Sequence, residues 1–165
     1  AINGDWIRTL APDDLAQRVV PYLVEAGVVS EPLTDRDRAV LAAAVPLVQE
    51  RMETLGQSVG MLGFLLVPAD RFAVDPDDAA AVLTADAAPV VQASIDALAD
   101  LSDWTAPAIE ASLRSALIDG LGLKPKVAFG PVRVAVTGRR VSPPLFESLE
   151  ILGRQTTLQR LEAAR

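Results

Sequence analysis

Apolar residues recur every three or four positions along much of this chain, the spacing that places side chains on one face of an α-helix. The clearest case lies between Thr34 and about Leu55. Thr34 is followed three residues later by Asp37, which resembles a capping box at the start of a helix. The positions that then share the helical spacing are Val40, Leu41, Ala44, Leu47, Val48, Arg51 and Leu55. We therefore predict one long amphipathic helix over this segment.

A second helix is predicted nearer the start of the chain. Its apolar positions are Leu15, Val19, Val20, Tyr22 and Leu23. We expect Asp13 to cap its start and Gly27 to end it, because Asp is a favoured N-cap and Gly adopts the left-handed conformation of many helix ends. Pro21 and Pro46 lie inside the two predicted helices, where a proline lacks the backbone N–H that a helix needs. Each proline is expected to bend or interrupt its helix.

The stretch from Pro68 to Asp78 separates two halves, because its Pro, Asp and Ala residues provide turns and caps without an apolar face. We place a boundary there, between subdomains of residues 1–70 and 71–165. Beyond it, caps and apolar spacing predict helices that begin at Asp75-Pro76, Pro89, Thr105, Ser142 and about Leu158. Ser142 is expected to cap a helix that begins at Pro143-Pro144. The pattern thus predicts an all-α chain in two packed helical subdomains.

Composition narrows the class of protein. Half of the 165 residues are hydrophobic and 22% are charged, the balance of a soluble globular protein. The longest apolar stretch, Met61 to Val67, is far shorter than the roughly 20 residues that span a bilayer, so we expect a cytoplasmic protein without a membrane partner. The chain contains no Cys and no His, which excludes thiolate zinc sites and removes the commonest general base. We expect no independent catalysis, no metal site, and, since Ala1 replaces a starting Met, a domain cut from a longer protein.

Charge is distributed unevenly along the chain. Residues 1–123 contain seven Lys and Arg against nineteen Asp and Glu, a net charge of −12, whereas residues 124–165 contain eight against three, a net charge of +5. A basic end of this kind is what an electrostatic footprint for nucleic acid looks like. Solvated charge on terminal helices explains the same numbers, so composition alone leaves both interpretations open.

One long motif resembles a known family. The run from Leu123 to Gly153, LKPKVAFGPVRVAVTGRRVSPPLFESLEILG, resembles the C-terminal signature of bacterial glutamyl-tRNA synthetases, in the region that binds the anticodon. Asn3-Gly4 with Ile7-Arg8 resembles the entry to that region, and Leu47 to Leu55, LVQERMETL, resembles its first anticodon-facing helix. The resemblance covers nearly the whole chain and implies an all-α fold of the class I synthetase anticodon-binding type.

The resemblance also bears on residues 127–136, whose β-branched side chains are typical of a strand. It implies a short helix there, ended by Gly138 in a left-handed conformation. Pro131 then has to lie where its missing N–H is tolerated. Propensity by itself does not predict this helix.

The resemblance implies that Arg51 reads the third anticodon base. A glutamate anticodon ends in U-C, and cytosine offers two adjacent acceptors, N3 and O2, that match the forked donors of an arginine. Guanine would present N–H donors to the same fork. The alternative is an ordinary exposed arginine that forms ion pairs with Glu50 or Glu53.

A second set of residues matches the family's pocket for the first and second anticodon bases: Arg133, Ser142, Pro143 and Leu145. A helix start exposes backbone N–H groups that can bind base or phosphate oxygens, and Pro143 and Leu145 can offer apolar surface to a base. The alternatives are a plain N-cap for Ser142 and core packing for Leu145. Gly130 departs from the Gln that the family frequently carries before this proline.

The function implied is anticodon recognition within a glutamate–tRNA ligase, an aminoacyl-tRNA synthetase. The chain itself is expected to be non-catalytic and without cofactor, since it lacks the His-Ile-Gly-His-like and Lys-Met-Ser-Lys-Ser-like ATP signatures. ATP and Mg²⁺ would serve a catalytic domain on the N-terminal side. The expected partners are glutamate tRNA and that catalytic domain, and not DNA. A helical protein-interaction or scaffolding module without RNA binding is the alternative, and charging of glutamine tRNA by the parent enzyme is left open.

Overall fold

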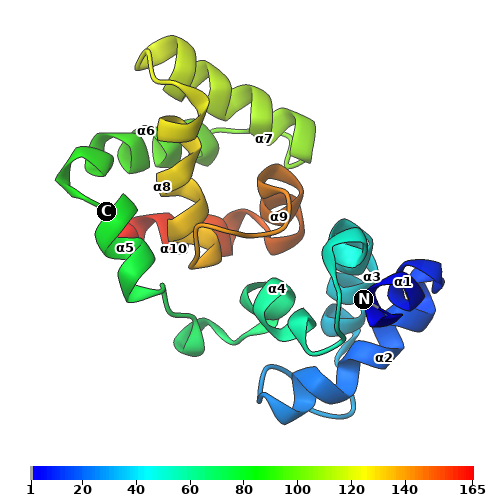
Figure 1. Ribbon diagram of the computed structural model, residues 1–165. Helices are drawn as coiled ribbons and strands as arrows, with labels where there is room; N and C mark the ends of the chain where they lie inside the picture. The colour runs from blue at the N-terminus through cyan, green and yellow to red at the C-terminus, as the bar shows by residue number, and fades with distance from the viewer. Residues whose placement is uncertain (1) are drawn as a thin grey trace. The chain divides into compact units, whose positions relative to one another are not determined.

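The computed structural model describes residues 2–165, and within this range it contains helices and no strand (Figure 1). Ala1 and the side chains of Ile2 and Asn3 lie outside the described residues. The Asn3 side chain of the Asn3-Gly4 motif is therefore not described. The chain divides into two compact units, unit 1 up to Phe72 and unit 2 from Ala73 to Arg165. The all-α prediction is confirmed.

Unit 1 is built from four α-helices and two short 3₁₀ turns. These are α1 (Ile2–Thr9), α2 (Pro12–Glu25), α3 (Asp35–Val48), η1 (Gln49–Arg51), α4 (Gln57–Leu66) and η2 (Ala69–Arg71). Helices α2, α3 and α4 pack against one another, and α1 packs against η1. Their shared core contains fully buried Leu15, Leu23, Ala44 and Leu62. The order of caps and apolar faces along the chain therefore produces a small helical bundle.

Two of the predicted helix ends in unit 1 are confirmed. The Thr34 side chain accepts a hydrogen bond from the backbone N–H of Asp37 at 3.0 Å, and the Asp37 carboxylate accepts one from the backbone N–H of Thr34 at 3.4 Å. Gly27 has a φ of +74° directly after α2. Its N–H donates to Val24 O and that of Val28 donates to Leu23 O, the hydrogen-bond pattern of a Schellman motif.

Two other boundaries differ from the prediction. Asp13 does not cap α2; Ala11 occupies the N-cap and Pro12 the first helical position, where its fixed φ suits the helix. The predicted helix from Thr34 to Leu55 ends at Val48, two residues after Pro46, and continues only as the 3₁₀ turn η1. Beyond that turn Met52 has extended backbone angles, so Arg51 lies at the end of a turn and not on a helix face.

Unit 2 places a central helix among its neighbours. Its elements are α5 (Pro76–Val82), η3 (Ala85–Ala87), α6 (Ala88–Ala99), α7 (Ala106–Leu113), the π-helical segment η4 (Arg114–Gly120), α8 (Pro125–Thr137), α9 (Leu145–Leu152) and α10 (Arg154–Ala164). Helix α8 packs against α5, α6 and α10 (Figure 1). Asp75 and Thr105 cap α5 and α7 through their side chains, as predicted.

Helix α8 confirms the expectation for residues 127–136. Its β-branched residues Val132, Val134 and Val136 are buried, so packing on several sides overrides their strand propensity. Gly138 ends the helix with a φ of +86° and donates its N–H to Val134 O at 2.9 Å.

Within residues 2–165, no single helix is long and apolar enough to cross a membrane. Pro76–Val82 and Ala85–Ala99 are together long and apolar enough, but a bend of 70° separates them.

The start of α9 corrects one further prediction. Ser142 is not its N-cap, and the helix begins at Leu145 instead of Pro143-Pro144. The physical reason is that a residue before a proline is disfavoured in the helical conformation, which keeps Pro143 out of the helix because Pro144 follows it. Pro144 therefore takes the N-cap position, and the Ser142 hydroxyl forms other hydrogen bonds.

Candidate nucleic-acid interface

The turn that carries Arg51 is anchored at both ends. Gln49 is 9% exposed, and its side-chain Nε2 donates to two backbone oxygens, Ile7 O at 2.9 Å and Leu10 O at 2.8 Å. Met52 is fully buried and its N–H donates to Gln49 O at 3.3 Å. Between these anchors, Glu50 and Arg51 are exposed. The Arg51 side chain is therefore exposed on a turn whose backbone is held in place at both ends.

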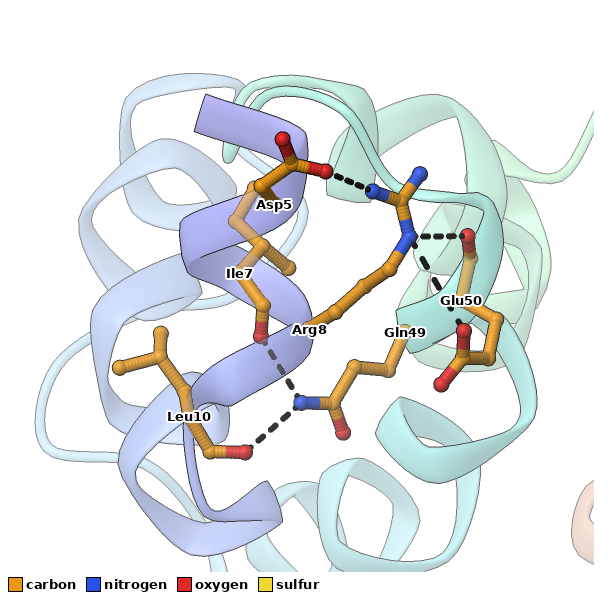
Figure 2. Close-up of polar contacts among 6 residues, drawn as sticks. All are labelled: Asp5, Ile7, Arg8, Leu10, Gln49 and Glu50. Atoms are coloured by element: carbon orange, nitrogen blue, oxygen red, sulfur yellow. Dashed lines mark hydrogen bonds and ion pairs between the residues drawn. The ribbon is translucent and has the colours of Figure 1, made fainter. Parts of the chain in front are cut away.

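Arg8 of α1 holds the same turn from the side. Its Nε donates to Glu50 O at 3.1 Å, and its Nη1 lies 3.1 Å from Asp5 Oδ1 (Figure 2). The Glu50 carboxylate also faces Arg8, with Oε2 3.9 Å from Nε. Glu50, one of the two acidic neighbours that the sequence offered as ion-pair partners for Arg51, therefore lies against Arg8.

The backbone that follows Arg51 is held by Gln57. Its Oε1 accepts hydrogen bonds from the backbone N–H of Glu53 at 2.7 Å and of Thr54 at 3.3 Å. Sequence reasoning did not identify the contacts of Gln49, Arg8 and Gln57, because no local signal marks them. Two of the three join segments about forty residues apart.

Near this turn, Trp6 and Tyr22 are about two-fifths exposed, at 41% and 40%. They line a shallow hollow of about 370 Å³ together with Leu55 and Gly56. The Arg18 guanidinium lies over the Trp6 ring, 4.9 Å from its centroid. Trp6 and Tyr22 are therefore surface aromatic residues and not part of the core.

In unit 2 the structure brings Arg133, Ser142 and Pro143 together. Arg133 lies on α8, and its Nη1 donates to Ser142 Oγ and to Pro143 O at 3.2 Å. The Ser142 hydroxyl itself donates to Pro143 O at 2.7 Å. Arg133 and Ser142 are half-buried. This arrangement fixes the guanidinium beside the residues that lead into α9.

Leu145 and Pro143 are buried, with Leu145 only 3% exposed. Their side chains form no open surface in this structure, which agrees with core packing for Leu145. Exposed apolar area in the same turn comes from Pro144 and from Val141, which is 73% exposed. Neither residue was predicted from the sequence, although Val141 directly precedes the Ser-Pro-Pro motif.

A groove of about 640 Å³ runs beside Arg133 within unit 2, lined mainly by residues of α5, η3, α6 and α8. Val82, Val90 and Phe129 contribute apolar lining, and Lys126 and Arg140 contribute positive charge. Gly130 also borders the groove, and a Cβ there would lie 3.7 Å from Val82 Cγ1. The missing side chain at Gly130 therefore leaves this part of the groove open.

The basic residues of the segment 124–165 fall into two groups: some hydrogen-bond to backbone carbonyls within the protein, and others are exposed. Arg154 donates to Leu101 O, and Arg160 is buried with its Nη1 2.8 Å from Val136 O. By contrast, Lys124 and Lys126 are exposed at the start of α8. In the part of the chain that the structure describes, no cluster of three or more His, Cys, Asp or Glu is placed to hold a metal ion.

Comparison with known proteins identifies relatives of this chain. A family model described as an anticodon binding domain matches residues 14–165. A glutamate–tRNA ligase of Acidothermus cellulolyticus is 56% identical over 163 residues, which are 99% of this chain and 32% of that protein. One from Kocuria rhizophila is 55% identical over 166 residues, covering 100% of this chain and 32% of the relative. The chain thus spans about a third of the length of these relatives.

The fold is also found in solved structures. The crystal structure of a glutamate tRNA ligase from Elizabethkingia meningosepticum aligns with a TM-score of 0.78 over 98% of this chain and 30% of its own, at 17% sequence identity. A glutamate-tRNA synthetase from Elizabethkingia anophelis aligns with a TM-score of 0.76 over the same shares.

Proposed function

The chain belongs to the family of anticodon-binding domains, and on this premise we propose that it recognises the anticodon loop of a tRNA within a glutamate–tRNA ligase. The observation that carries the proposal is the 56% identity, over 99% of the chain, to a protein named as such a ligase. The tRNA proposed is the one that accepts glutamate. A helical interaction module without RNA binding is not favoured, because the relatives that match the whole length of this chain are named as tRNA ligases.

Catalysis belongs to the rest of the ligase in this proposal. The chain has no His and spans about a third of its relatives, so activation of glutamate with ATP and Mg²⁺ takes place in a catalytic domain outside these residues. The chain supplies tRNA identity. We place the protein in the cytoplasm, where its tRNA is charged.

Arg51 is proposed to read the third anticodon base. Sequence-specific RNA recognition acts on unstacked bases in loops, whose Watson–Crick edges hydrogen-bond to side chains. An exposed guanidinium at the end of an anchored turn can donate two parallel hydrogen bonds to N3 and O2 of cytosine. Guanine presents N–H donors at the same edge, and two sets of donors repel. The site therefore favours C over G.

The cluster around Arg133 is proposed to bind the first and second bases. The guanidinium is held by Ser142 and by the carbonyl of Pro143, so it meets a base in a preset orientation. Exposed Val141 and Pro144 offer apolar surface on which a base can rest. Lys124 and Lys126 are exposed nearby in sequence and suit phosphate groups of the loop.

Titration with tRNA tests the proposal. The protein is mixed with glutamate tRNA, at low and at physiological salt, and with the same tRNA carrying an unrelated anticodon. We expect binding that weakens steeply as salt rises, because phosphate contacts release counterions, and weaker binding of the altered tRNA. Equal binding of the two tRNAs, or none at low salt, would reject anticodon recognition.

A further inference from the structure

We infer that Gln49 and Arg8 are positioning residues for Arg51, because they fix the turn that presents its guanidinium to the anticodon. The inference rests on the proposed function and goes beyond it by assigning a task to helix α1. Neither residue is expected to touch RNA.

Gln49 joins the turn to the C-terminal end of α1. Gln49 Nε2 donates to Ile7 O in the last turn of α1 at 2.9 Å and to Leu10 O, one residue beyond the helix, at 2.8 Å. Ile7 O also accepts from the backbone N–H of Leu10 at 3.2 Å. A side-chain amide nitrogen carries two hydrogens, and each has an acceptor here. A glutamate or a leucine at this position would offer no such donors. The side chain thus caps α1 and holds the first residue of η1 in place.

Arg8 fixes the peptide group that leads directly into Arg51. Its Nε donates to Glu50 O at 3.1 Å, and that carbonyl shares one planar peptide group with the N–H of Arg51. Fixing the carbonyl therefore orients the backbone from which the Arg51 side chain departs. Asp5 in turn holds the Arg8 guanidinium, with Oδ1 3.1 Å from Nη1 (Figure 2).

The turn is held on its other side as well. Met52 is fully buried and bonded to Gln49 O, and Gln57 accepts from the backbone of Glu53 and Thr54. The backbone on both sides of Arg51 is therefore held in place before a base binds. Preorganisation of this kind raises affinity and selectivity, because less freedom is lost on binding.

Helix α1 precedes the residues that match the anticodon-binding family, since that match begins at residue 14. The carbonyls that accept from Gln49 Nε2 and the guanidinium that donates to Glu50 O lie in this preceding segment, at residues 7–10. The family match therefore contains Gln49 and Glu50 but not their partners on and next to α1.

The test is a double-mutant cycle in the full-length ligase that carries this chain. Aminoacylation efficiency, kcat/KM, is measured on two glutamate-tRNA transcripts that differ only in C or G at the third anticodon position. The variants are Gln49→Leu, Arg8→Ala, Arg51→Gln, and Arg51→Gln combined with each of the first two. Arg38→Ala is the matched control for Arg8, because Arg38 forms an ion pair with Asp35 on α3, away from the turn. Val19→Ala is the control for lost stability, because Val19 is a fully buried residue of α2.

We expect Gln49→Leu and Arg8→Ala each to lower the C-over-G ratio roughly three- to ten-fold, because a displaced donor keeps only part of a contact that gives about ten- to hundred-fold discrimination. In the Arg51→Gln background the same changes should have no further effect on the ratio, since their effect passes through Arg51. Arg8→Lys should restore part of the ratio. Arg38→Ala and Val19→Ala should leave it unchanged, although Val19→Ala lowers the melting temperature.

A wild-type ratio in both Gln49→Leu and Arg8→Ala, beside a reduced ratio in Arg51→Gln, would overturn the positioning role and leave the proposed function intact. A wild-type ratio in Arg51→Gln itself would overturn base reading by Arg51, and the positioning role with it. Because Arg8 is exposed, its variant remains informative even if Gln49→Leu fails to fold.

Discussion

Arg140 holds both carboxylate oxygens of Asp78: its backbone N–H donates to Oδ2 at 2.9 Å and its Nε to Oδ1 at 2.8 Å. The pair joins the first turn of α5 to the turn after α8, which are 62 residues apart in the chain. The backbone hydrogen bond is the main cause that lowers the pKa of Asp78 below its ordinary value, and the Arg140 side chain adds to it against an opposing effect of burial.

Asp78→Asn is expected to lower the midpoint of thermal unfolding at neutral pH. A lowered pKa stabilises the folded state above the unfolded-state value of 3.8, and that stabilisation is lost as the pH falls through the folded-state pKa. The difference in midpoint between wild type and variant should be constant above about pH 5 and shrink below it. Circular dichroism melts across this range measure it. Asp35→Asn is the control, because its ion pair is exposed, and an equal Asp78→Asn difference at neutral and acid pH would contradict the assignment.

Arg51→Gln is expected to relax discrimination at the third anticodon position. The substitution replaces a forked charged donor with an amide that also offers an acceptor, so guanine becomes tolerable. Selectivity for C over G should fall roughly ten- to hundred-fold, the worth of one good bidentate base contact of about 1–3 kcal/mol. The rate of ATP–pyrophosphate exchange by the full-length ligase should stay at the wild-type value under conditions in which that exchange does not depend on base reading. An unchanged ratio would show that Arg51 is a surface arginine without a part in base reading.

Arg133→Ala should behave differently from Arg51→Gln. It removes the hydrogen bonds to Ser142 and to the carbonyl of Pro143, so the pocket proposed for the first two bases loses its donor. We expect kcat/KM for the cognate tRNA to fall roughly ten-fold or more, by analogy with one base contact, without any gain for G at the third position. Arg114→Ala is a matched control on a neighbouring element, because Arg114 pairs with Glu110 at the surface. If Arg133→Ala raised kcat/KM on the G-containing transcript, the two sites would not be separate.

Two glycines of unit 1 should respond in opposite directions to alanine. Gly63 lies inside α4, and a Cβ there would meet only Val28 Cγ2, at 3.9 Å. Gly63→Ala should therefore stabilise unit 1 by about 0.5–1 kcal/mol, the difference between Gly and Ala within a helix. Gly27→Ala should destabilise it by about 1–2 kcal/mol, because the φ of +74° is strained for any residue with a Cβ. Urea unfolding of both variants measures the signs, and equal signs would refute the argument.

Lys126 and Arg160 should separate RNA binding from stability. Lys126 is exposed, so Lys126→Ala should weaken tRNA binding and reduce the slope of log K against log salt by about 0.7–0.9, the contribution of one phosphate contact. Its melting temperature should stay at the wild-type value. Arg160→Leu removes a donor to the buried carbonyl of Val136 and should cost about 1–3 kcal/mol of stability without changing the salt slope. An unchanged slope in Lys126→Ala would assign that lysine to solvated surface.

Local signals were enough for much of the fold. The capping box of Thr34 and Asp37 and the stop at Gly27 involve residues within five positions of one another, so the sequence carries all the parts of each. Two of the three misplaced helix starts involve proline; the third, predicted at about Leu158, lies at Arg154. Pro12 displaced the expected cap at Asp13, and Pro144 kept Pro143 outside its helix, because proline restricts both its own φ and the residue before it.

Helices α1 and α4 were not predicted, for different reasons. Helix α1 has only eight residues, too few for an apolar spacing to repeat, and it packs against η1. Helix α4 is apolar on nearly every side, with Leu62, Phe64, Leu65 and Leu66 all buried, so no polar face revealed its period. The helical state of residues 127–136 was expected only from the resemblance, because their packing overrides propensity.

The helical class, several helix ends, and the presence of Arg51 and Arg133 in their motifs follow from the sequence alone. The tertiary structure alone decided what holds these arginines, because the partners are distant in the chain. Gln49 meets the carbonyls of Ile7 and Leu10 across 42 and 39 residues, and no pattern of spacing records such a pair. A hydrogen bond depends on distances of a few tenths of an ångström, and only the packing of α1 against η1 sets them.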